Sequence, residues 1–346
     1  MAVITKRRIG QTDLMVSTLG LGCASIGNLY HKVPTDEANK IVKSAWDAGF
    51  RYFDTAPHYG QGLSERRIGD ALRGQVSGEY ALSTKVGRLL QPAGYAEERH
   101  GFVSPMPFDF IYDYSYDGVM RSFEDSLQRL GLDSVDILYM HDIGAATHGD
   151  KHASIFRDAM EGGFRALEEL KNSGMIKAIG IGANEYEVCE EALDYGDWDC
   201  FLLAGRYTLL EQEALNSFLP KCVERKSTII IGGPYNSGIL ATGTKGKGPW
   251  HYDYGRAPDD VVAKVSKIET ICAEFNIELA AAALQFPLAH PAVCSVIPGI
   301  GSARRVYQTL DLFSTEIPIE FWSALSEHGL LSDGAPVPGT TGGLIK

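Results

Sequence analysis

The feature that most constrains the fold is an alternation of short apolar runs with longer amphipathic segments along the whole chain. Some of the short runs, such as the one from Thr228 to Ile231, are apolar at consecutive positions. Consecutive apolar residues indicate a strand buried on both faces, as in a parallel sheet covered by helices. We predict eight such strands, at residues 17–23, 50–55, 79–86, 134–141, 178–184, 200–206, 227–233 and 293–298.

The amphipathic segments between these runs carry apolar residues at helical spacing. We expect Thr35 to cap the first helix, and Gly49 and Gly131 to end the first and third. Eight strands, each followed by a helix, predict an α/β fold, the (β/α)8 TIM barrel, as a single domain over residues 1–346; a doubly wound sheet is the structural alternative. The predicted helices span 36–48, 64–73, 116–130, 156–172, 186–195, 211–224, 258–275 and 303–313.

Three segments interrupt the repeat. Residues 5–16 precede the first barrel strand and are expected to form a β-hairpin that caps the bottom of the barrel. Two long connections, 87–115 and 234–257, follow the third and seventh strands. In a barrel both lie on the C-terminal face, where loops of this length usually bind ligands. Within the second, the glycine- and lysine-rich stretch 243–248 is expected to be a flexible lid.

Composition narrows the class of partner. The 346 residues include 44 acidic and 32 basic side chains, a formal net charge of −12. This charge repels phosphate backbones, so we expect no nucleic acid and no membrane as partner, and no stretch reaches the ~20 apolar residues of a membrane span. Six cysteines without a C-x-x-C pair, and no uninterrupted apolar run near the N-terminus, indicate a cytoplasmic protein with reduced thiols. We expect a small-molecule substrate and leave a homo-oligomer open.

Polar side chains with complementary chemistry follow three neighbouring predicted strands. Asp54 ends the second strand and Tyr59 lies just beyond it, Lys85 lies in the third, and His141 ends the fourth. In a barrel these strand ends meet at one rim. Each residue alone has a plain structural explanation, such as a helix cap or an ion pair. Their joint occurrence at three consecutive strand ends favours a catalytic site.

The chemistry of these four groups suggests how they would act together. Pairing with Asp54 would keep a buried Lys85 charged. That charge would lower the pKa of Tyr59 from its ordinary value of about 10. Tyr59 could then exchange a proton with a reacting oxygen, while a neutral His141 positions that oxygen through a hydrogen bond.

Motifs around these residues carry a resemblance to a known family. They are D-T-A-x-x-Y-G at 54–60, S-E at 64–65, S-T-K-V at 83–86 and S-V-D-I-L-Y-M-H-D at 134–142. The chain resembles the aldo-keto reductases, (β/α)8-barrel oxidoreductases that use nicotinamide dinucleotides, from residue 8 to residue 299. The resemblance implies a catalytic tetrad with Tyr59 as general acid/base, Lys85 as modulator of its pKa, Asp54 as partner of Lys85 and His141 as orienting group.

Three further stretches, 101–118, 121–132 and 204–210, resemble one subgroup of that family. It comprises sugar 1-dehydrogenases acting on L-fucose and related threo-aldoses, together with pyridoxal 4-dehydrogenases. The resemblance implies NAD(P)-dependent oxidation of a cyclic hemiacetal such as L-fucose, L-galactose or D-arabinose at C1 to a lactone. The alternatives are oxidation of pyridoxal to 4-pyridoxolactone, and a cofactor-binding regulatory barrel with little turnover, against which the intact tetrad argues.

No G-x-G-x-x-G motif follows any strand, so a Rossmann domain is not predicted. Barrels commonly bind phosphate at the loops after strands seven and eight and at a helix N-terminus. Ser302 is expected to cap the helix after the eighth strand. By resemblance, Asn184 would hold the nicotinamide carboxamide and Arg305 would contact the cofactor. Other expected cofactor contacts are glycines and serines of the two loops: Gly233, Ser237, Gly238, Gly299 and Ser302.

Some positions depart from the family pattern. Ala204 stands where relatives commonly have glutamine, and Gly232 where they commonly have an aromatic residue, so Arg206 or Tyr207 would have to compensate. Gly299 stands where NADP-preferring relatives commonly have lysine. We therefore expect NAD rather than NADP, although Arg304 and Arg305 provide positive charge nearby.

Substrate contacts are expected around the rim, from His58 beside the tyrosine and from the aromatic residues Tyr30, Tyr112 and Trp250. His148 and His152 are spaced like helical metal ligands. We expect them to be solvated histidines of a polar loop, and we predict no metal site.

Overall fold

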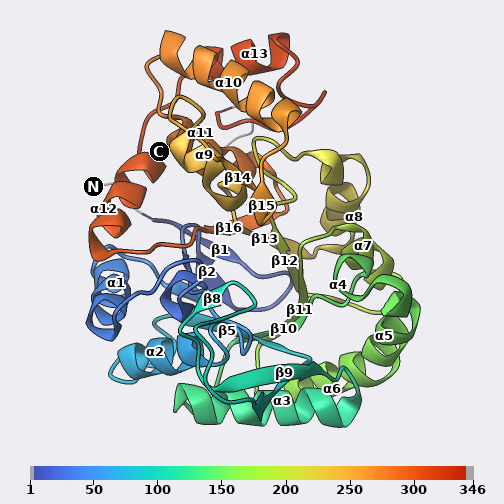
Figure 1. The fold of residues 1–346 in the computed structure, drawn as a ribbon. Coiled ribbons are helices and arrows are strands. Elements are labelled where there is room, and N and C mark those ends of the chain that lie inside the picture. Colours follow the sequence, from blue (N-terminus) through green and yellow to red (C-terminus); the bar gives the residue numbers. More distant parts are fainter. Residues whose placement is uncertain (1–3, 340–346) are drawn as a thin grey trace.

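The computed structural model describes residues 4–339, so both ends of the predicted domain lie outside the described residues. Its centre is an eight-stranded sheet whose strands follow one another in chain order and pair in parallel. Bridges from Leu19 to Val296 and from Gly22 to Gly299 join the first strand to the last, which confirms the predicted (β/α)8 barrel (Figure 1). The strands are β3 (Leu21–Gly22), β4 (Tyr52–Asp54), β5 (Ala81–Val86), β10 (Ile137–His141), β11 (Ala178–Ala183), β12 (Cys200–Ala204), β13 (Thr228–Gly232) and β16 (Val293–Ile297).

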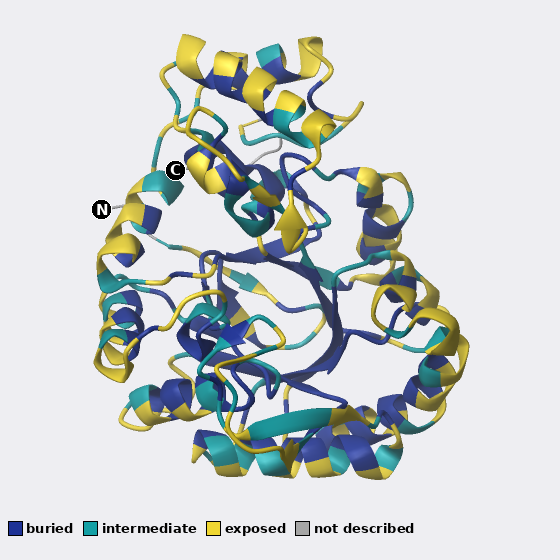
Figure 2. Cartoon of the chain, viewed as in Figure 1, coloured by how far each residue is buried: buried dark blue, intermediate teal, exposed yellow. Residues whose placement is uncertain are grey.

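Helices surround the barrel, with buried faces toward the strands and exposed faces outward (Figure 2). This arrangement explains why the helical segments are amphipathic while the strands are continuously apolar. The larger helices are α1 (Thr35–Asp47), α2 (Leu63–Leu72), α3 (Tyr116–Leu130), α5 (His152–Asp158), α6 (Phe164–Asn172), α7 (Glu187–Ala192), α8 (Phe218–Arg225), α10 (Asp259–Glu274), α11 (Leu279–Gln285), α12 (Ala303–Phe313) and α13 (Ile319–Glu327).

Several helical details differ from the prediction: α7 is shorter than 186–195, α8 begins only at Phe218, and α11 and α13 were not predicted. Thr35 does not cap α1, because it is the first helical residue and Pro34 is the N-cap. The Thr35 hydroxyl accepts a hydrogen bond from Arg67 instead. The helix predicted over 156–172 is also not continuous. One π-helical stretch, Ala159–Gly163, joins α5 to α6. The expected glycine ends are confirmed at Gly49 and Gly131, both with positive φ.

The predicted hairpin is present as β1 (Lys6–Arg8) and β2 (Met15–Ser17), which pair in antiparallel. Ile9, Leu14 and Val16 belong to the apolar cluster inside the barrel. Gly10, at the turn, approaches the backbone of Asp199 just before β12 so closely that a Cβ would lie 2.6 Å from its carbonyl oxygen. The hairpin therefore closes the barrel at the N-terminal ends of its strands.

Alternation along the strands decides which side chains face the interior. In β10, Ile137 and Tyr139 belong to the interior cluster, whereas Leu138 and Met140 belong to the layer under the helices. A strand has a side-chain period of two. His141, the last residue of β10, therefore lies on the interior side at the C-terminal rim.

The long connections are both structured. The connection after β5 forms two antiparallel pairs, and the one after β13 holds a short helix and a hairpin. These elements are β6 (Arg88–Pro92) with β9 (Phe108–Tyr112), β7 (Glu98–Arg99) with β8 (Phe102–Val103), α9 (Ile239–Thr242), and β14 (His251–Tyr252) with β15 (Gly255–Arg256).

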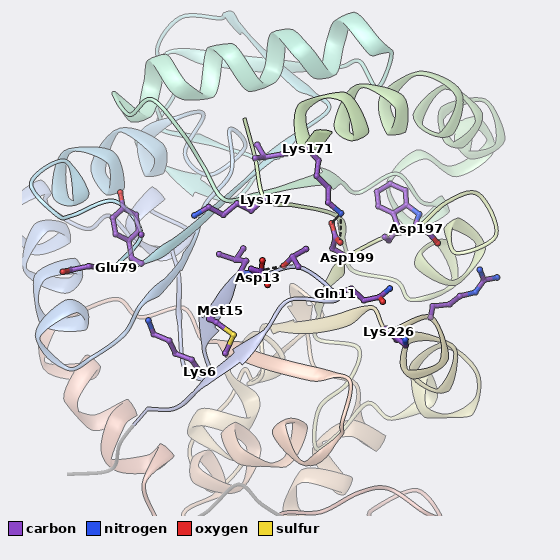
Figure 3. Close-up of a pocket in the computed structure, with 17 residues that line it drawn as sticks. Lys6, Gln11, Asp13, Met15, Glu79, Lys171, Lys177, Asp197, Asp199 and Lys226 are labelled. Carbon is purple, nitrogen blue, oxygen red and sulfur yellow. Dashed lines mark hydrogen bonds and ion pairs between the residues drawn. The ribbon is translucent and has the colours of Figure 1, made fainter. Parts of the chain in front are cut away.

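A hollow of about 900 Å³ lies beside the β1–β2 hairpin, at the end of the barrel opposite the predicted site (Figure 3). Its charged side chains are partly neutralised by ion pairs. Lys171 contacts Asp199 at 2.6 Å, and Lys177 contacts Asp136 at 2.7 Å. The hollow contains none of the four residues predicted to be catalytic, so its size does not make it the active site.

The six cysteines are all free and buried. Within residues 4–339, no single helix is long and apolar enough to cross a membrane; α10 and the helical stretch Leu279–Ala289 reach that length and composition only jointly, across a bend of 104°.

We predict that Gly69→Ala destabilises the barrel. A Cβ at this position in α2 would lie 1.9 Å from the carbonyl oxygen of Leu130, at the end of α3. Separating the two helices should lower the free energy of unfolding by about 2 kcal/mol, measured by urea denaturation. Gly74→Ala is the matched control, because a Cβ there would meet no atom within 4 Å. Equal stability of the two variants would contradict the packing described.

Candidate active site

An ion pair inside the barrel joins the second and third strands. Asp54 and Lys85 are 2% and 1% exposed, and Lys85 Nζ donates to Asp54 Oδ2 at 2.7 Å. Lys85 also donates to the Thr55 carbonyl at 2.9 Å, and the Ser83 hydroxyl donates to the second Asp54 oxygen at 2.7 Å. The predicted contact is therefore present, and both charges have additional hydrogen bonds in place of water.

Tyr59 lies in a tight turn after β4. Its neighbour Gly60 has φ +64° and contacts Gly27 so closely that a Cβ would lie 2.3 Å from the Gly27 oxygen. Contact between these two backbones fixes the turn against the loop after β3. Lys85 Nζ then lies 4.7 Å from the centroid of the Tyr59 ring. The turn thus places the phenol over the buried ammonium.

His141 completes the group from the end of β10. Its ring is nearly perpendicular to that of Tyr59, with 6.1 Å between centroids. Tyr114 donates a hydrogen bond to its backbone carbonyl at 2.6 Å. Burial lowers the pKa of His141 well below its ordinary value, so the imidazole is neutral, as expected. The fold thus brings all four predicted side chains together.

The pKa of Tyr59 differs from the prediction. Burial raises it well above its ordinary value, Asp54 and Asp142 raise it further, and Arg88 opposes them. We predicted that Lys85 would lower this pKa. That prediction is wrong for this structure because Asp54 already neutralises Lys85 and because burial disfavours the phenolate. Tyr59 therefore keeps its proton at neutral pH.

A second hollow, of about 190 Å³, adjoins these residues. It extends from Asp54 and Tyr59 to the loops after β13 and β16, where Gly233, Ser237 and Gly299 line it as expected for cofactor contacts. Ala204 and Gly232, two of the departures from the family pattern, lie in the same wall, as do Arg206 and Tyr30. Tyr207, by contrast, is fully buried, with its ring against Phe286 and His290. Of the two proposed substitutes, only Arg206 reaches the hollow.

A dinucleotide suits the walls of this hollow. Gly238 and Gly301 do not line the hollow itself but follow Ser237 and Gly299 in the same two loops, and a Cβ at either would meet no atom within 4 Å. Glycines there permit a phosphate to approach the backbone closely. The volume is below the ~300 Å³ of common ligand pockets, so a dinucleotide must extend past Gly299 or displace the roof of the hollow.

The β14–β15 hairpin forms that roof. Tyr254 donates to Asn184 Oδ1 at 3.1 Å, and Asp253 contacts Arg206 at 2.7 Å. Asn184, the expected carboxamide partner, is thus at the site and bonded to the roof. The glycine-rich stretch 243–248 was predicted to be the lid, but Thr244 is bonded to Glu269 of α10. The hairpin, not that stretch, covers the hollow.

The N-terminus of α12 carries a contact that sequence reasoning missed. Ser302 is the N-cap residue, as predicted, but its side chain makes no capping hydrogen bond. The Ala303 N–H donates instead to Glu37 Oε1 of α1, at 2.9 Å. Arg305 lies exposed in the first turn. No local pattern identifies Glu37, because it is 266 residues away along the chain.

The four expected substrate residues are in different places. His58 lies 6.0 Å from His141 between ring centroids and makes edge contacts with Phe102 and Phe110. Tyr30 lines the small hollow. Tyr112 lies on β9, its ring centroid 5.4 Å from the Arg88 guanidinium.

Trp250, the fourth expected substrate residue, packs against the apolar cluster between the strands and the helices. It is half-buried and directly precedes β14, and its contact with substrate stays a prediction.

The prediction of solvated loop histidines is wrong. His148 ends the short helix α4 (Ala145–His148) and contacts the Asp142 carbonyl at 2.9 Å, while His152 begins α5 and contacts the Ile143 carbonyl at 3.2 Å. Both therefore hold the chain after β10. Within residues 4–339, no group of three or more His, Cys, Asp or Glu side chains is placed to hold a metal ion.

Comparison with known proteins identifies the family. The model of the Aldo/keto reductase family matches residues 18–329. Pyridoxal 4-dehydrogenase of Microbacterium luteolum is 43% identical over 343 residues, covering 94% of this chain and 98% of the relative. D-threo-aldose 1-dehydrogenase of a Pseudomonas species is 38% identical over 332 residues, with the same coverage of 94% and 98%. Among solved structures, the holo form of an aldo-keto reductase from Bacillus halodurans superposes with a TM-score of 0.74 at 25% identity, covering 98% of this chain and 99% of that one. The chain therefore belongs to the aldo/keto reductase family of NAD(P)-dependent oxidoreductases.

Proposed function

We propose that this enzyme oxidises a cyclic hemiacetal to a lactone, with NAD⁺ as the oxidant. The observation that supports the proposal most is the placement of Tyr59 and His141 over the buried Lys85–Asp54 pair. Tyr59 takes the proton of the hemiacetal hydroxyl, and neutral His141 holds that oxygen by a hydrogen bond. A nicotinamide held beside this site would supply the acceptor for the hydride that leaves the carbon carrying this hydroxyl. Because burial raises the pKa of Tyr59, it is the deprotonated fraction of this phenol that takes the proton.

Two substrate classes contain this functional group. Aldoses such as L-fucose, L-galactose and D-arabinose close into hemiacetals, and likeness to D-threo-aldose 1-dehydrogenase supports them. Pyridoxal also closes into a hemiacetal, whose oxidation yields 4-pyridoxolactone. Likeness to pyridoxal 4-dehydrogenase supports this second substrate. So does the cluster of His58, Phe102 and Phe110 next to His141, which would offer aromatic contacts to a flat heterocycle.

Cofactor preference follows from charge near the N-terminus of α12. Gly299 supplies no cation to a 2′-phosphate, and the Glu37 carboxylate already accepts the Ala303 N–H. The Glu37 carboxylate would repel a further negative charge there, and Arg304 and Arg305 in the same turn counter part of that repulsion. These two features support NAD over NADP. The residues that would hold the dinucleotide are Asn184, Gly233, Ser237, Gly238, Gly299, Ser302 and Arg305.

Substrate choice is tested by incubating the purified protein with NAD⁺ or NADP⁺ and each of the three sugars or pyridoxal, and following nucleotide reduction by absorbance. Oxidation of one of the four substrates is the expected result. No reduction of either nucleotide with any of them would contradict the proposed reaction.

Tyr59→Phe should lower kcat by about 1,000-fold, because the proton acceptor is lost, while the Kd for NAD⁺ stays within error. Steady-state kinetics and fluorescence titration measure the two quantities. Tyr195→Phe, which removes an exposed hydroxyl on the outside of the barrel, is the control and should leave kcat unchanged. Near-native turnover by Tyr59→Phe would rule out the assigned role.

The rate of oxidation should rise with pH. Only deprotonated Tyr59 can take the substrate proton, and its pKa lies above the ordinary value. The kcat/KM for oxidation should therefore increase between about pH 6 and pH 9, whereas that for the reverse reduction should not. A profile for oxidation that falls over this range would show that another group is the base.

Glu37→Gln should weaken the preference for NAD⁺. Glutamine keeps an acceptor for the Ala303 N–H and removes the charge, so the ratio of the Kd for NADP⁺ to that for NAD⁺ should fall by about 3- to 10-fold. Calorimetry with each nucleotide measures the ratio. Asp36→Asn, on an exposed face of the same helix, is the control. An unchanged ratio in Glu37→Gln would exclude Glu37 as the discriminating charge.

A further inference from the structure

The site contains a second buried ion pair, in addition to Lys85–Asp54. Arg88, at the start of β6, contacts Asp142 Oδ2 through Nη2 at 2.5 Å, and the two side chains are only 5% and 11% exposed. The guanidinium lies 4.9 Å from the centroid of the Phe110 ring and 5.4 Å from that of Tyr112. Buried ion pairs contribute little to stability, since desolvation offsets their attraction. The pair therefore calls for a role other than holding the fold together.

Asp142 also reaches His141. Its Oδ2 lies 3.4 Å from His141 Nε2. The other ring nitrogen, Nδ1, is buried and has no hydrogen-bond partner within residues 4–339. Within the described residues, the Asp142 carboxylate thus lies beside Nε2 while Nδ1 has no partner, so Nε2 is the ring nitrogen whose direction Asp142 can influence.

The backbone of Asp142 is itself tightly held. Its φ of +52° is unusual for a residue other than glycine. Its N–H donates to the Gly182 carbonyl at 2.8 Å, and its carbonyl accepts hydrogen bonds from Tyr114 at 3.3 Å and from His148 at 2.9 Å. Contacts from three elements thus hold a strained residue beside the reacting group, as is common at functional sites.

We propose that Arg88 and Asp142 are positioning residues: Asp142, clamped by Arg88, holds the His141 imidazole in the orientation that meets the reacting oxygen. The inference rests on the proposed function, in which His141 binds that oxygen. Arg88 keeps the carboxylate ionised and in place, because a lone buried carboxylate would take up a proton. The charges facing the imidazole agree with this arrangement. Burial raises the pKa of Asp142 while Arg88 and Lys85 oppose the increase, and Arg88, Lys85 and His58 keep His141 neutral.

The test compares Asp142→Asn, Arg88→Met and the double variant Arg88→Met/Asp142→Asn. The double variant matters most, because it leaves no unpaired buried charge and so separates positioning from folding. We expect kcat to fall by about 100-fold in Asp142→Asn and in the double variant, as a misplaced catalytic group predicts. KM and the Kd for NAD⁺ should change by less than about 3-fold, because Asp142 is not expected to bind either ligand. The substrate is whichever of the three sugars or pyridoxal the native enzyme oxidises fastest.

Lys171→Met is the matched control. It removes the partner of Asp199 in another ion pair, at the opposite end of the barrel, and should lower Tm without changing kcat. Native kcat in the double variant would overturn the positioning role and leave the proposed function intact, provided that Tyr59→Phe remains inactive. A KM increase that accounts for the whole loss would also overturn it, because that result indicates substrate binding. Full activity in Tyr59→Phe would overturn both proposals.

Discussion

The contact between Lys85 and Asp54 sets the conditions for the rest of the site. Two charges at 1% and 2% exposure are stable only if each is paired and hydrogen-bonded. The parallel register of β4 and β5 places Asp54 opposite Ser83. Ser83 therefore donates a hydrogen bond to the carboxylate, and Lys85, two residues further along the same strand, forms the ion pair. The ammonium then lies under the Tyr59 ring. The strands and the β1–β2 hairpin together leave this pair almost without contact to water.

Features that depend on local periodicity were predictable from the sequence. The eight strands, the hairpin and the glycines that end α1 and α3 follow from side-chain spacing and backbone conformation. The meeting of Asp54, Lys85 and His141 follows too, because each lies at an interior position near the end of a parallel strand.

Contacts between distant residues were not predictable in this way. Glu37 reaches α12 only because α1 and α12 pack together. The Arg88–Asp142 pair depends on how the connection after β5 folds back over β10. The direction of the Tyr59 pKa was predicted wrongly for a related reason, since the degree of burial and the competing carboxylates are properties of the assembled barrel. The spacing of residues in the sequence indicates which side chains meet in the barrel. Their pKa values depend on burial and on neighbouring charges in the folded structure.

The β1–β2 hairpin covers the N-terminal end of a barrel whose interior is already packed with side chains of the strands. Ile9, Leu14 and Val16 fill its base, so substrate, dinucleotide and water must all exchange across the same rim. Water that is displaced when ligands bind must therefore leave the site across this rim as well. The roof hairpin and the connection after β5 border this rim, so the space that they leave sets which ligands can enter and how much water stays with them.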